Sequence, residues 1–213
     1  MRHYSAGILE PMELLEGELG KPRQKYPQEQ NHPWISILLD IYHLVDSWVR
    51  VETELRGLNI ACKKGCGHCC KLLTVPINHL EFRGLCWYVF EILQGDERYQ
   101  VKSRFLDHNE DAECPFLIND SCIVYPLRPI GCRQFFVLSR PCFARENPWI
   151  KRRQDIYSAL NHDISWMIAK MYFPFYGIIT EEEQRKAYEE GFLIESDRPL
   201  TSYSWVTIGK KIV

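Results

Sequence analysis

CKKGCGHCCK, at residues 62–71, holds four of the nine cysteines of this 213-residue chain. Thiols this close repel one another when they ionise, unless a cation gathers them. Only two residues separate Cys66 from Cys69, so a single tight turn can present both sulfurs to one ion. Gly65 and Gly67 permit the backbone conformations that such a turn requires. The stretch therefore predicts a metal site.

Composition and charge limit the classes of protein to which the chain can belong. Apolar residues make up 46% of the chain and charged residues 25%, which is typical of a globular protein that folds without disulfide bonds. A net charge of -2 gives no broad basic field, which argues against a nucleic-acid partner. The chain shows no secretory signal and no apolar run that could span a bilayer, so we expect a cytoplasmic protein with no membrane partner.

The pattern of apolar residues divides the chain into an arm and one helical domain. Residues 1–33 are polar and contain four prolines, which predicts a flexible N-terminal arm. From Trp34 to Leu55, apolar residues recur in steps of three and four, and Gly57 follows, which predicts a long helix leading into the cysteine stretch. We expect residues 34–213 to form a single helical domain, with the cysteine-cluster core at residues 62–145.

Other segments also show helix signals. Asn78 is a good N-cap residue, Glu81 completes a capping box three positions later, and Gly95 supplies a stop, so a helix is expected over residues 78–95. The other predicted helices cover residues 97–108, 152–174 and 181–190, the last behind a capping box of Thr180 and Glu183.

The second half of the cysteine-rich segment contains a turn signal. Asn119, Asp120 and Ser121 separate two short apolar runs, which predicts a β-hairpin. Cys114 and Cys122 lie at the two ends of this hairpin. The predicted fold is therefore mainly α with a small β-hairpin, a compact helical domain organised around a cysteine-rich metal centre.

The second half of the cysteine-rich segment contains four cysteines, as does the first half. They are Cys114, Cys122, Cys132 and Cys142. In a reducing compartment thiols stay unpaired, and an odd number of cysteines with Cys69 next to Cys70 fits a disulfide framework poorly. Eight thiols exceed the four that a tetrahedral ion binds, and adjacent cysteines would be strained to reach one ion. Two metal centres, or one cluster with spare thiols, are both compatible with this pattern.

Basic residues accompany the second group of cysteines. Between Cys122 and Cys142 the chain has Arg128, Arg133 and Arg140 and no acidic residue, and Arg145 follows. Four thiolates around a zinc ion carry excess negative charge, which nearby guanidinium groups would stabilise. A solvated basic face is the alternative, because most surface arginines have no such role.

Three further residues have side chains that can bind a metal. His68 lies between two predicted ligands, but a turn position exposed to solvent is the simpler interpretation, since the thiols already supply enough donors. His108 is a weaker candidate than His68. Cys86 lies in an apolar helical segment and is predicted to be a core residue.

With these residues in view, the chain resembles the YkgJ-type cysteine-cluster family, also called the zinc- or iron-chelating CxxCxxCC domain. The resemblance lies in CKKGCGHCC at 62–70, CPFL at 114–117, CIVYPLRPIGCRQF at 122–135 and CFAR at 142–145. Arg128, Pro129 and Arg133 also fall on the recurrent RP..CR positions of the family. The resemblance implies that a metal ion is bound by Cys62, Cys66, Cys69, Cys70, Cys114, Cys122 and Cys132, with Cys142 as an eighth ligand.

The resemblance leaves two classes of function open. The first is a metal-binding module whose cofactor is zinc or iron, with an otherwise uncharacterised role and room for an unknown protein partner. The alternative is an iron-sulfur-dependent, protein-modifying enzyme similar to flagellin lysine N-methylases, in which the iron forms a 4Fe–4S cluster. No glycine-rich nucleotide loop supports the enzyme, and no catalytic residue can be named.

A third interpretation can be rejected at this point. Cys62, Cys66 and Cys69 reproduce the C-x3-C-x2-C spacing of radical S-adenosylmethionine enzymes. Those enzymes place the motif after the first strand of a strand-helix barrel. Only 143 mostly helical residues follow Cys70 here, which does not suit such a barrel.

Overall fold

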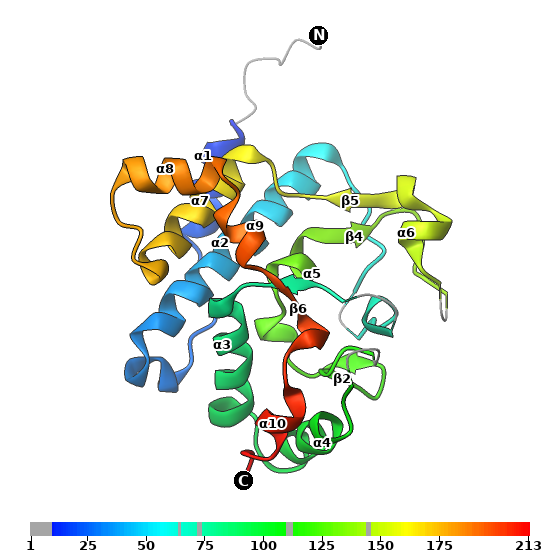
Figure 1. Cartoon of the computed structure of the whole chain (residues 1–213). Coiled ribbons are helices and arrows are strands. Elements are labelled where there is room, and N and C mark those ends of the chain that lie inside the picture. The colour runs from blue at the N-terminus through cyan, green and yellow to red at the C-terminus, as the bar shows by residue number, and fades with distance from the viewer. Residues whose placement is uncertain (1–9, 64, 72–73, 110–112, 144–145) are drawn as a thin grey trace.

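The computed structural model describes residues 10–63, 65–71, 74–109, 113–143 and 146–213, and this part of the chain is mainly helical (Figure 1). The α-helices are α1 (Pro11–Leu19), α2 (Pro33–Arg56), α3 (His79–Trp87), α4 (Gly95–Leu106), α5 (Ile130–Gln134), α6 (Pro148–Lys151), α7 (His162–Tyr172), α8 (Glu181–Glu189), α9 (Phe192–Ser196) and α10 (Trp205–Gly209). The strands are β1 (Pro76–Ile77), β2 (Leu117–Ile118), β3 (Ser121–Cys122), β4 (Phe135–Val137), β5 (Ile156–Ser158) and β6 (Arg198–Pro199). Short helical turns are η1 (Pro27–Asn31), η2 (Cys69–Lys71), η3 (Tyr88–Ile92), η4 (Tyr125–Leu127), η5 (Arg153–Asp155), η6 (Phe173–Tyr176) and η7 (Leu200–Ser202).

Helix α2 is the longest element, and much of the core packs against it. It contacts α1, α3, α5 and α7. Its apolar residues recur at helical spacing, so one face is buried while charged residues such as Arg50 face outward. Gly57 ends the helix in the left-handed conformation, as its place in the sequence predicted.

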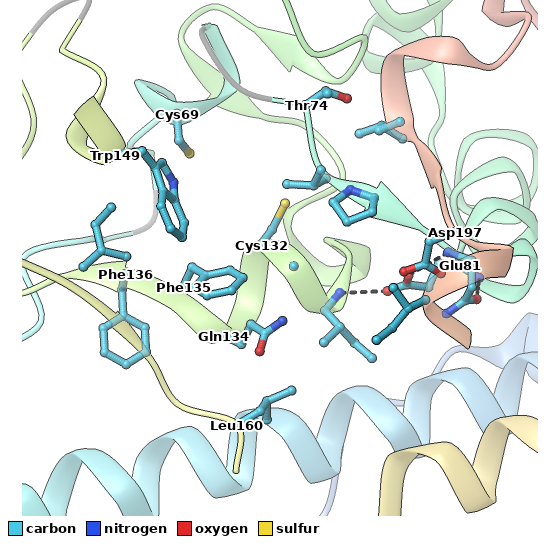
Figure 2. A pocket seen from close by; sticks show the side chains of 18 of the residues that line it. Cys69, Thr74, Glu81, Cys132, Gln134, Phe135, Phe136, Trp149, Leu160 and Asp197 are labelled. Atoms are coloured by element: carbon cyan, nitrogen blue, oxygen red, sulfur yellow. Dashed lines mark hydrogen bonds between the residues drawn. The ribbon is translucent and has the colours of Figure 1, made fainter. Parts of the chain in front are cut away.

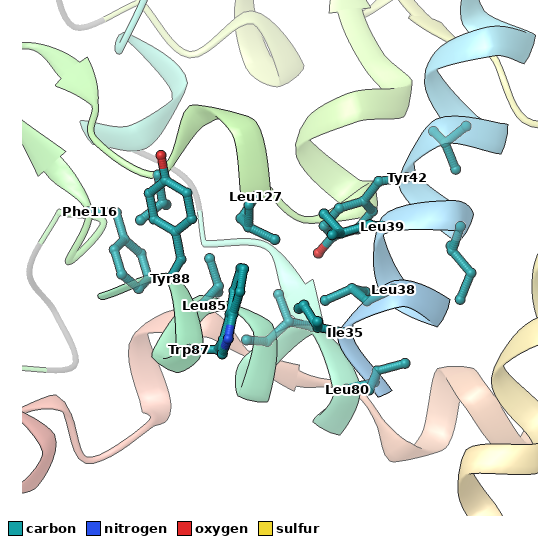
Figure 3. Packing of buried hydrophobic residues seen from close by; sticks show 14 of the residues in the cluster. Ile35, Leu38, Leu39, Tyr42, Leu80, Leu85, Trp87, Tyr88, Phe116 and Leu127 are labelled. Carbon is teal, nitrogen blue, oxygen red and sulfur yellow. The ribbon is translucent and has the colours of Figure 1, made fainter. Parts of the chain in front are cut away.

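The core continues from α2 to α3 and the cysteine-bearing segment. Figure 3 shows Ile35 and Leu38 of α2 facing Leu80 and Leu85 of α3, with Leu127 of η4 close by. Each of these five side chains is fully shielded from solvent. Burying a side chain of this size stabilises a fold by roughly 1.5–3 kcal/mol. The cysteine-bearing segment is thus attached to a firm scaffold.

The strands form three antiparallel pairs rather than one hairpin. The pair β2–β3 is the predicted hairpin, with Leu117 opposite Cys122. Strand β4 pairs with β5, and β1 pairs with β6. The structure therefore confirms a mainly α fold with small β elements, and two of its strand pairs join segments that are distant in sequence.

Most predicted helices are present, with two corrections. The capping boxes at Asn78 and Thr180 form as expected. Gly95 does not end the helix from residue 78, which gives way to η3 and ends at Ile92; Gly95 begins α4 instead. The prediction of one helix over 152–174 was wrong in its first part, because residues 156–158 pair with β4 and α7 begins only after the cap residue Asn161.

The N-terminal segment is helical where the structure describes it. Residues 1–9 lie outside the described residues. Helix α1 packs on α2 and buries Leu15 completely, so residues 11–19 contribute to the core. A flexible arm over residues 1–33 with a domain boundary after it stays a prediction. Among the described helices, none has the length and apolar character needed to cross a membrane.

Candidate metal centre

The stretch at residues 62–71 is held against β4. Beyond α2, the backbone N–H of Ala61 donates to the carbonyl of Val137 at 2.9 Å. The Val137 N–H in turn donates to Sγ of Cys62 at 3.4 Å. Because Cys62 and Val137 are far apart in sequence, this contact fixes the first cysteine group beside the second.

The turn that carries Cys66 and Cys69 packs on the β2–β3 hairpin. Gly65 adopts a φ of +87°, a region that side chains disfavour. A Cβ atom on Gly67 would lie 2.6 Å from Cδ1 of Leu117 and would overlap the carbonyl oxygen of Asp120. Only glycine therefore allows this close approach of the two segments, which supports the turn that the sequence predicted.

Gly67→Ala tests this contact. We expect the variant to lose roughly 1–3 kcal/mol of unfolding free energy, as overpacking of a closed contact does. The hairpin backbone would have to move away from the turn. Chemical denaturation measures the loss, and Gly17→Ala in the exposed part of α1, where an added Cβ meets nothing within 4 Å, is the matched control. Equal stability of both variants would show that the turn does not rest on the hairpin.

The hairpin and the helix after it position the second group of cysteines. Asn119 and Asp120 have φ values of 49° and 61°, so the two-residue turn reverses the chain tightly and places Cys122 beside the turn. The backbone N–H of Cys114 donates to the carbonyl of Cys70 at 2.8 Å. Cys132 lies in α5, immediately before β4.

Cys62, Cys66 and Cys142 form a first thiol neighbourhood, which also reaches Cys69. Desolvation raises the pKa of Cys62, and the charges of Cys66, Cys69 and Cys142 raise it further. Desolvation also raises the pKa of Cys142, although the Arg152 guanidinium opposes this by donating to Sγ at 3.3 Å. These thiols come from residues 62–69 and from the loop after β4.

Cys70, Cys114, Cys122 and Cys132 form a second neighbourhood that also includes Cys69. The thiol of Cys69 donates to Cys70, and that of Cys70 donates to Cys114; these hydrogen bonds are the main reason that the pKa values of Cys69 and Cys70 are raised. Burial raises the pKa of Cys122 to about 11. Burial also raises the pKa of Cys132, and the charges of Cys70, Cys69 and Cys122 add to this. Cys69, Cys70, Cys122 and Cys132 are therefore protonated near neutral pH.

All eight predicted ligands thus lie in two neighbourhoods, but among the described residues these thiols do not form a coordination site. Within the described residues, no three His, Cys, Asp or Glu side chains form a group that could hold a metal ion as they stand. Cys69, Cys70 and Cys114 are instead joined by hydrogen bonds between their thiols. The donor set still fits zinc or iron, because soft sulfur ligands select these metals and deprotonate on binding them.

Arg133 has a structural role that the sequence did not reveal. Its side chain is almost fully buried, pairs with Asp46 of α2 and donates to the carbonyls of Arg128 and Pro126. The guanidinium also stacks over the ring of Tyr42 at 4.0 Å. The arginine therefore connects η4 and α5 to α2. Its charge also offsets part of the rise in the pKa of the nearby Cys122.

The other arginines do not form a free basic face. Arg128 lies 3.5 Å from Asp46, and Arg140 pairs with Glu146 at 2.9 Å. Arg145 lies outside the described residues. Arg152, which the sequence analysis missed because it follows the last cysteine by ten positions, is the guanidinium that contacts a thiol. Its own pairing with Glu146 at 2.9 Å fixes its orientation.

The three additional candidates from the sequence have different surroundings. His68 is half-buried rather than exposed, and its Nδ1 has no hydrogen-bond partner among the described residues. His108 is buried and lies 3.2 Å from the Thr201 carbonyl, a contact outside the thiol neighbourhoods. Cys86 packs against the core as predicted, and burial raises its pKa to about 12.

A large cavity adjoins the thiols (Figure 2). Its volume is about 820 Å³, and its walls are mostly apolar. Figure 2 places Cys69 and Trp149 on one side, Cys132 near the centre, and Glu81 with Asp197 on the opposite side. The residues around it come from segments spread along the chain, which is why the sequence alone did not reveal the cavity. The thiols that line it are Cys62, Cys69, Cys70, Cys114, Cys132 and Cys142.

Comparison with known proteins adds one match. The family named CxxCxxCC, described as "Putative zinc- or iron-chelating domain", matches residues 61–156. Comparisons with curated proteins and with solved structures gave no match. The matched segment includes all eight predicted ligands together with Arg152, whereas Asp197 on the far side of the cavity lies beyond it. Residues 61–156 are therefore similar to the CxxCxxCC family, and this match covers less than half of the chain.

Proposed function

We propose that the protein binds zinc or iron through two four-thiol centres. The first would use Cys62, Cys66, Cys69 and Cys142, and the second would use Cys70, Cys114, Cys122 and Cys132. The observation that supports this division is the pair of thiol neighbourhoods, which meet at the adjacent residues Cys69 and Cys70. Two centres also remove the strain of aiming two adjacent cysteines at one ion.

The charges near the thiols favour such centres. Four thiolates around a divalent ion leave a net negative charge, which nearby cations stabilise. Arg152 donates to Cys142 in the first centre. In the second, Arg128 and Arg133 act on Cys122 and oppose the rise in its pKa. Each proposed centre thus has a guanidinium close to one of its ligands.

Metal analysis of cysteine variants tests the division. Protein purified without oxygen should contain two filled centres, which are two metal equivalents if each holds a single ion, and Cys142→Ser and Cys122→Ser should each empty one of them, because each removes a ligand from a different centre. A Cys62→Ser/Cys142→Ser double variant should lose no more than Cys142→Ser alone. A Cys122→Ser/Cys142→Ser double variant should lose both.

The control is Cys86→Ala, which removes a core cysteine outside both neighbourhoods and should keep the full metal content. Additive loss of metal within the first centre would contradict the division. Wild-type protein without zinc or iron that is still fully folded would contradict metal binding itself. A visible absorption band of an iron-sulfur cluster would identify iron as the metal, whereas colourless protein that contains zinc would identify zinc.

A second candidate function is an iron-sulfur-dependent, protein-modifying enzyme similar to flagellin lysine N-methylases. The observation that favours it is the cavity beside the thiols, because a catalytic cluster needs space for a substrate. A purely structural metal site would not require a cavity of this size. Iron-sulfur absorbance together with cysteine-dependent modification of a protein substrate would support the enzyme, and zinc in both centres would argue against it.

A further inference from the structure

The far side of the cavity carries two carboxylates that have no cationic partner. Glu81 is fully buried and Asp197 half-buried, and both line the cavity. In the described part of the chain, neither carboxylate forms an ion pair with a lysine, arginine or histidine. Buried charges in proteins are normally paired, so this arrangement needs an explanation.

Backbone hydrogen bonds compensate only in part for the burial of these carboxylates. Glu81 accepts hydrogen bonds from the N–H groups of Ile130 at 2.7 Å and Asn78 at 3.2 Å. Burial still raises its pKa to about 7; the charge of Asp197 adds to this, and the charge of Arg133, which forms no ion pair with Glu81, opposes it only in part. Burial alone raises the pKa of Asp197 to about 6. A positive charge between the two carboxylates would relieve both the burial and the mutual repulsion.

A third polar group lines the same cavity. Tyr172 of α7 is 1% exposed, and its hydroxyl lies beside the Asn78 side chain but makes no hydrogen bond of good geometry among the described residues. A buried hydroxyl without a partner is less stable than a bonded one. A ligand that donates or accepts hydrogen bonds beside Glu81 could therefore complete this group as well.

The walls between the carboxylates and the thiols are suited to an apolar molecule. Phe135, Trp149 and Leu160 line the cavity, and Figure 2 shows Phe135 and Trp149 on the same side as Cys69. Phe135 and Trp149 meet edge to face at 5.4 Å and are partly exposed, so the cavity opens to solvent beside them. A volume of about 820 Å³ lies within the range of roughly 300–1,000 Å³ that small-molecule sites occupy.

From the cavity, its apolar walls and the unpaired carboxylates, we infer that the protein binds a small organic ammonium ion, with its apolar body along Phe135 and Leu160 and its amine between Glu81 and Asp197. A metal ion fits this end less well. Calcium needs about six to eight oxygen ligands, and two carboxylates among apolar walls do not supply them. The aromatic ring of Tyr172 can also stabilise an ammonium ion. Binding at this end does not require the thiols.

Binding of three matched probes tests the inference. Phenylbutylamine, phenylbutanol and phenylbutyrate share one apolar body and carry a positive, neutral and negative end. Titration calorimetry on the full chain near neutral pH should show that the amine binds at least about tenfold more tightly than the alcohol, as a close charge pair provides. The acid should bind more weakly than the alcohol, because it repels the carboxylates.

Asp197→Asn is the decisive variant. Within the described residues the Asp197 side chain makes no hydrogen bond, so the substitution removes its charge without removing a contact that stabilises the fold. It should remove most of the preference for the amine and leave binding of the alcohol unchanged. Glu81→Gln should act in the same direction, although it also weakens the hydrogen bonds that the carboxylate accepts from the N–H groups of Asn78 and Ile130. Glu182→Gln on the exposed face of α8 is the matched control and should change nothing.

Three outcomes would overturn the inference. They are equal binding of amine and alcohol, an unchanged preference in Asp197→Asn, and no binding of any probe. The metal content of the same samples separates this failure from a failure of the proposed function. Normal metal with no amine preference would reject only the ammonium site, whereas absent metal with amine binding would reject only the metal centres.

Discussion

Cys132→Ser is expected to lose the metal of the second centre and to unfold at a clearly lower temperature than the wild-type protein. Cys132 lies in α5, where its backbone N–H donates to Pro129 at 2.9 Å, and its thiol neighbours Cys70 and Cys122. Loss of an outer-shell partner already weakens metal binding about 10–100-fold, so loss of a ligand should weaken it more.

The size of the effect follows from the coupling of metal binding to folding. Structural zinc contributes on the order of 10–16 kcal/mol in small zinc domains. If even a third of that is lost, the unfolding temperature falls steeply, since each kcal/mol corresponds to about 2–4 °C in a chain of this size. Differential scanning calorimetry with metal analysis measures both changes.

Cys86→Ser is the matched control, because it makes the same chemical change at a core cysteine outside the neighbourhoods. It should keep its metal and lose only about 1 kcal/mol or a little more, as a buried hydroxyl replaces a thiol. Stripping metal from the wild-type protein with a chelator should reproduce the loss seen in Cys132→Ser. If Cys132→Ser keeps its metal and melts with the wild-type protein, Cys132 is not a ligand.

Arg133→Ala is expected to cost about 2–4 kcal/mol of unfolding free energy, because it removes a buried guanidinium together with its ion pair to the partly exposed Asp46 and its hydrogen bonds to two carbonyls. The change leaves Asp46 without its buried partner and frees the carbonyls of Arg128 and Pro126. It also removes the guanidinium that stacks on Tyr42. Arg133→Lys should lose most of this stability too, because an ammonium group cannot reproduce the planar fork.

Arg140→Ala provides the comparison for this second prediction. Arg140 also forms an ion pair, but its side chain is 43% exposed, so the loss should be about 1 kcal/mol or less. Urea denaturation measures all three variants. Folded Arg133→Ala protein should keep its metal, because the arginine acts through the position of α5 rather than as a ligand. Equal losses in Arg133→Ala and Arg140→Ala would contradict the structural role of Arg133.

Local signals made much of the helical fold predictable. The stripe from Trp34 to Leu55, the cap at Asn78 and the turn at Asn119 each depend on neighbouring residues, and each appears in the structure. Pairing between distant segments was not predictable in this way. Residues 156–158 continue a helical pattern of apolar residues, yet they meet the edge of β4, and no local signal records that partner.

The candidate site shows the same difference between local and distant information. The clustered cysteines marked the metal-binding segment, because their spacing is a property of short stretches. Arg152, Trp149 and Asp197 carry no spacing signal, and only the folded chain brings them to the thiols and the cavity. Arg152 lies in a run of three basic residues at 151–153, but this run follows the last cysteine and so lay outside the segment between the cysteines.

The contact between Cys62 and Val137 has a consequence for how the chain reaches its native state. These residues are 75 positions apart, so a long loop must close before the sulfur meets β4. Contacts of such separation form slowly compared with helices. During synthesis, the first cysteine group therefore emerges well before the segment that completes it, and its thiols stay open to oxidation until the later half of the chain has been made.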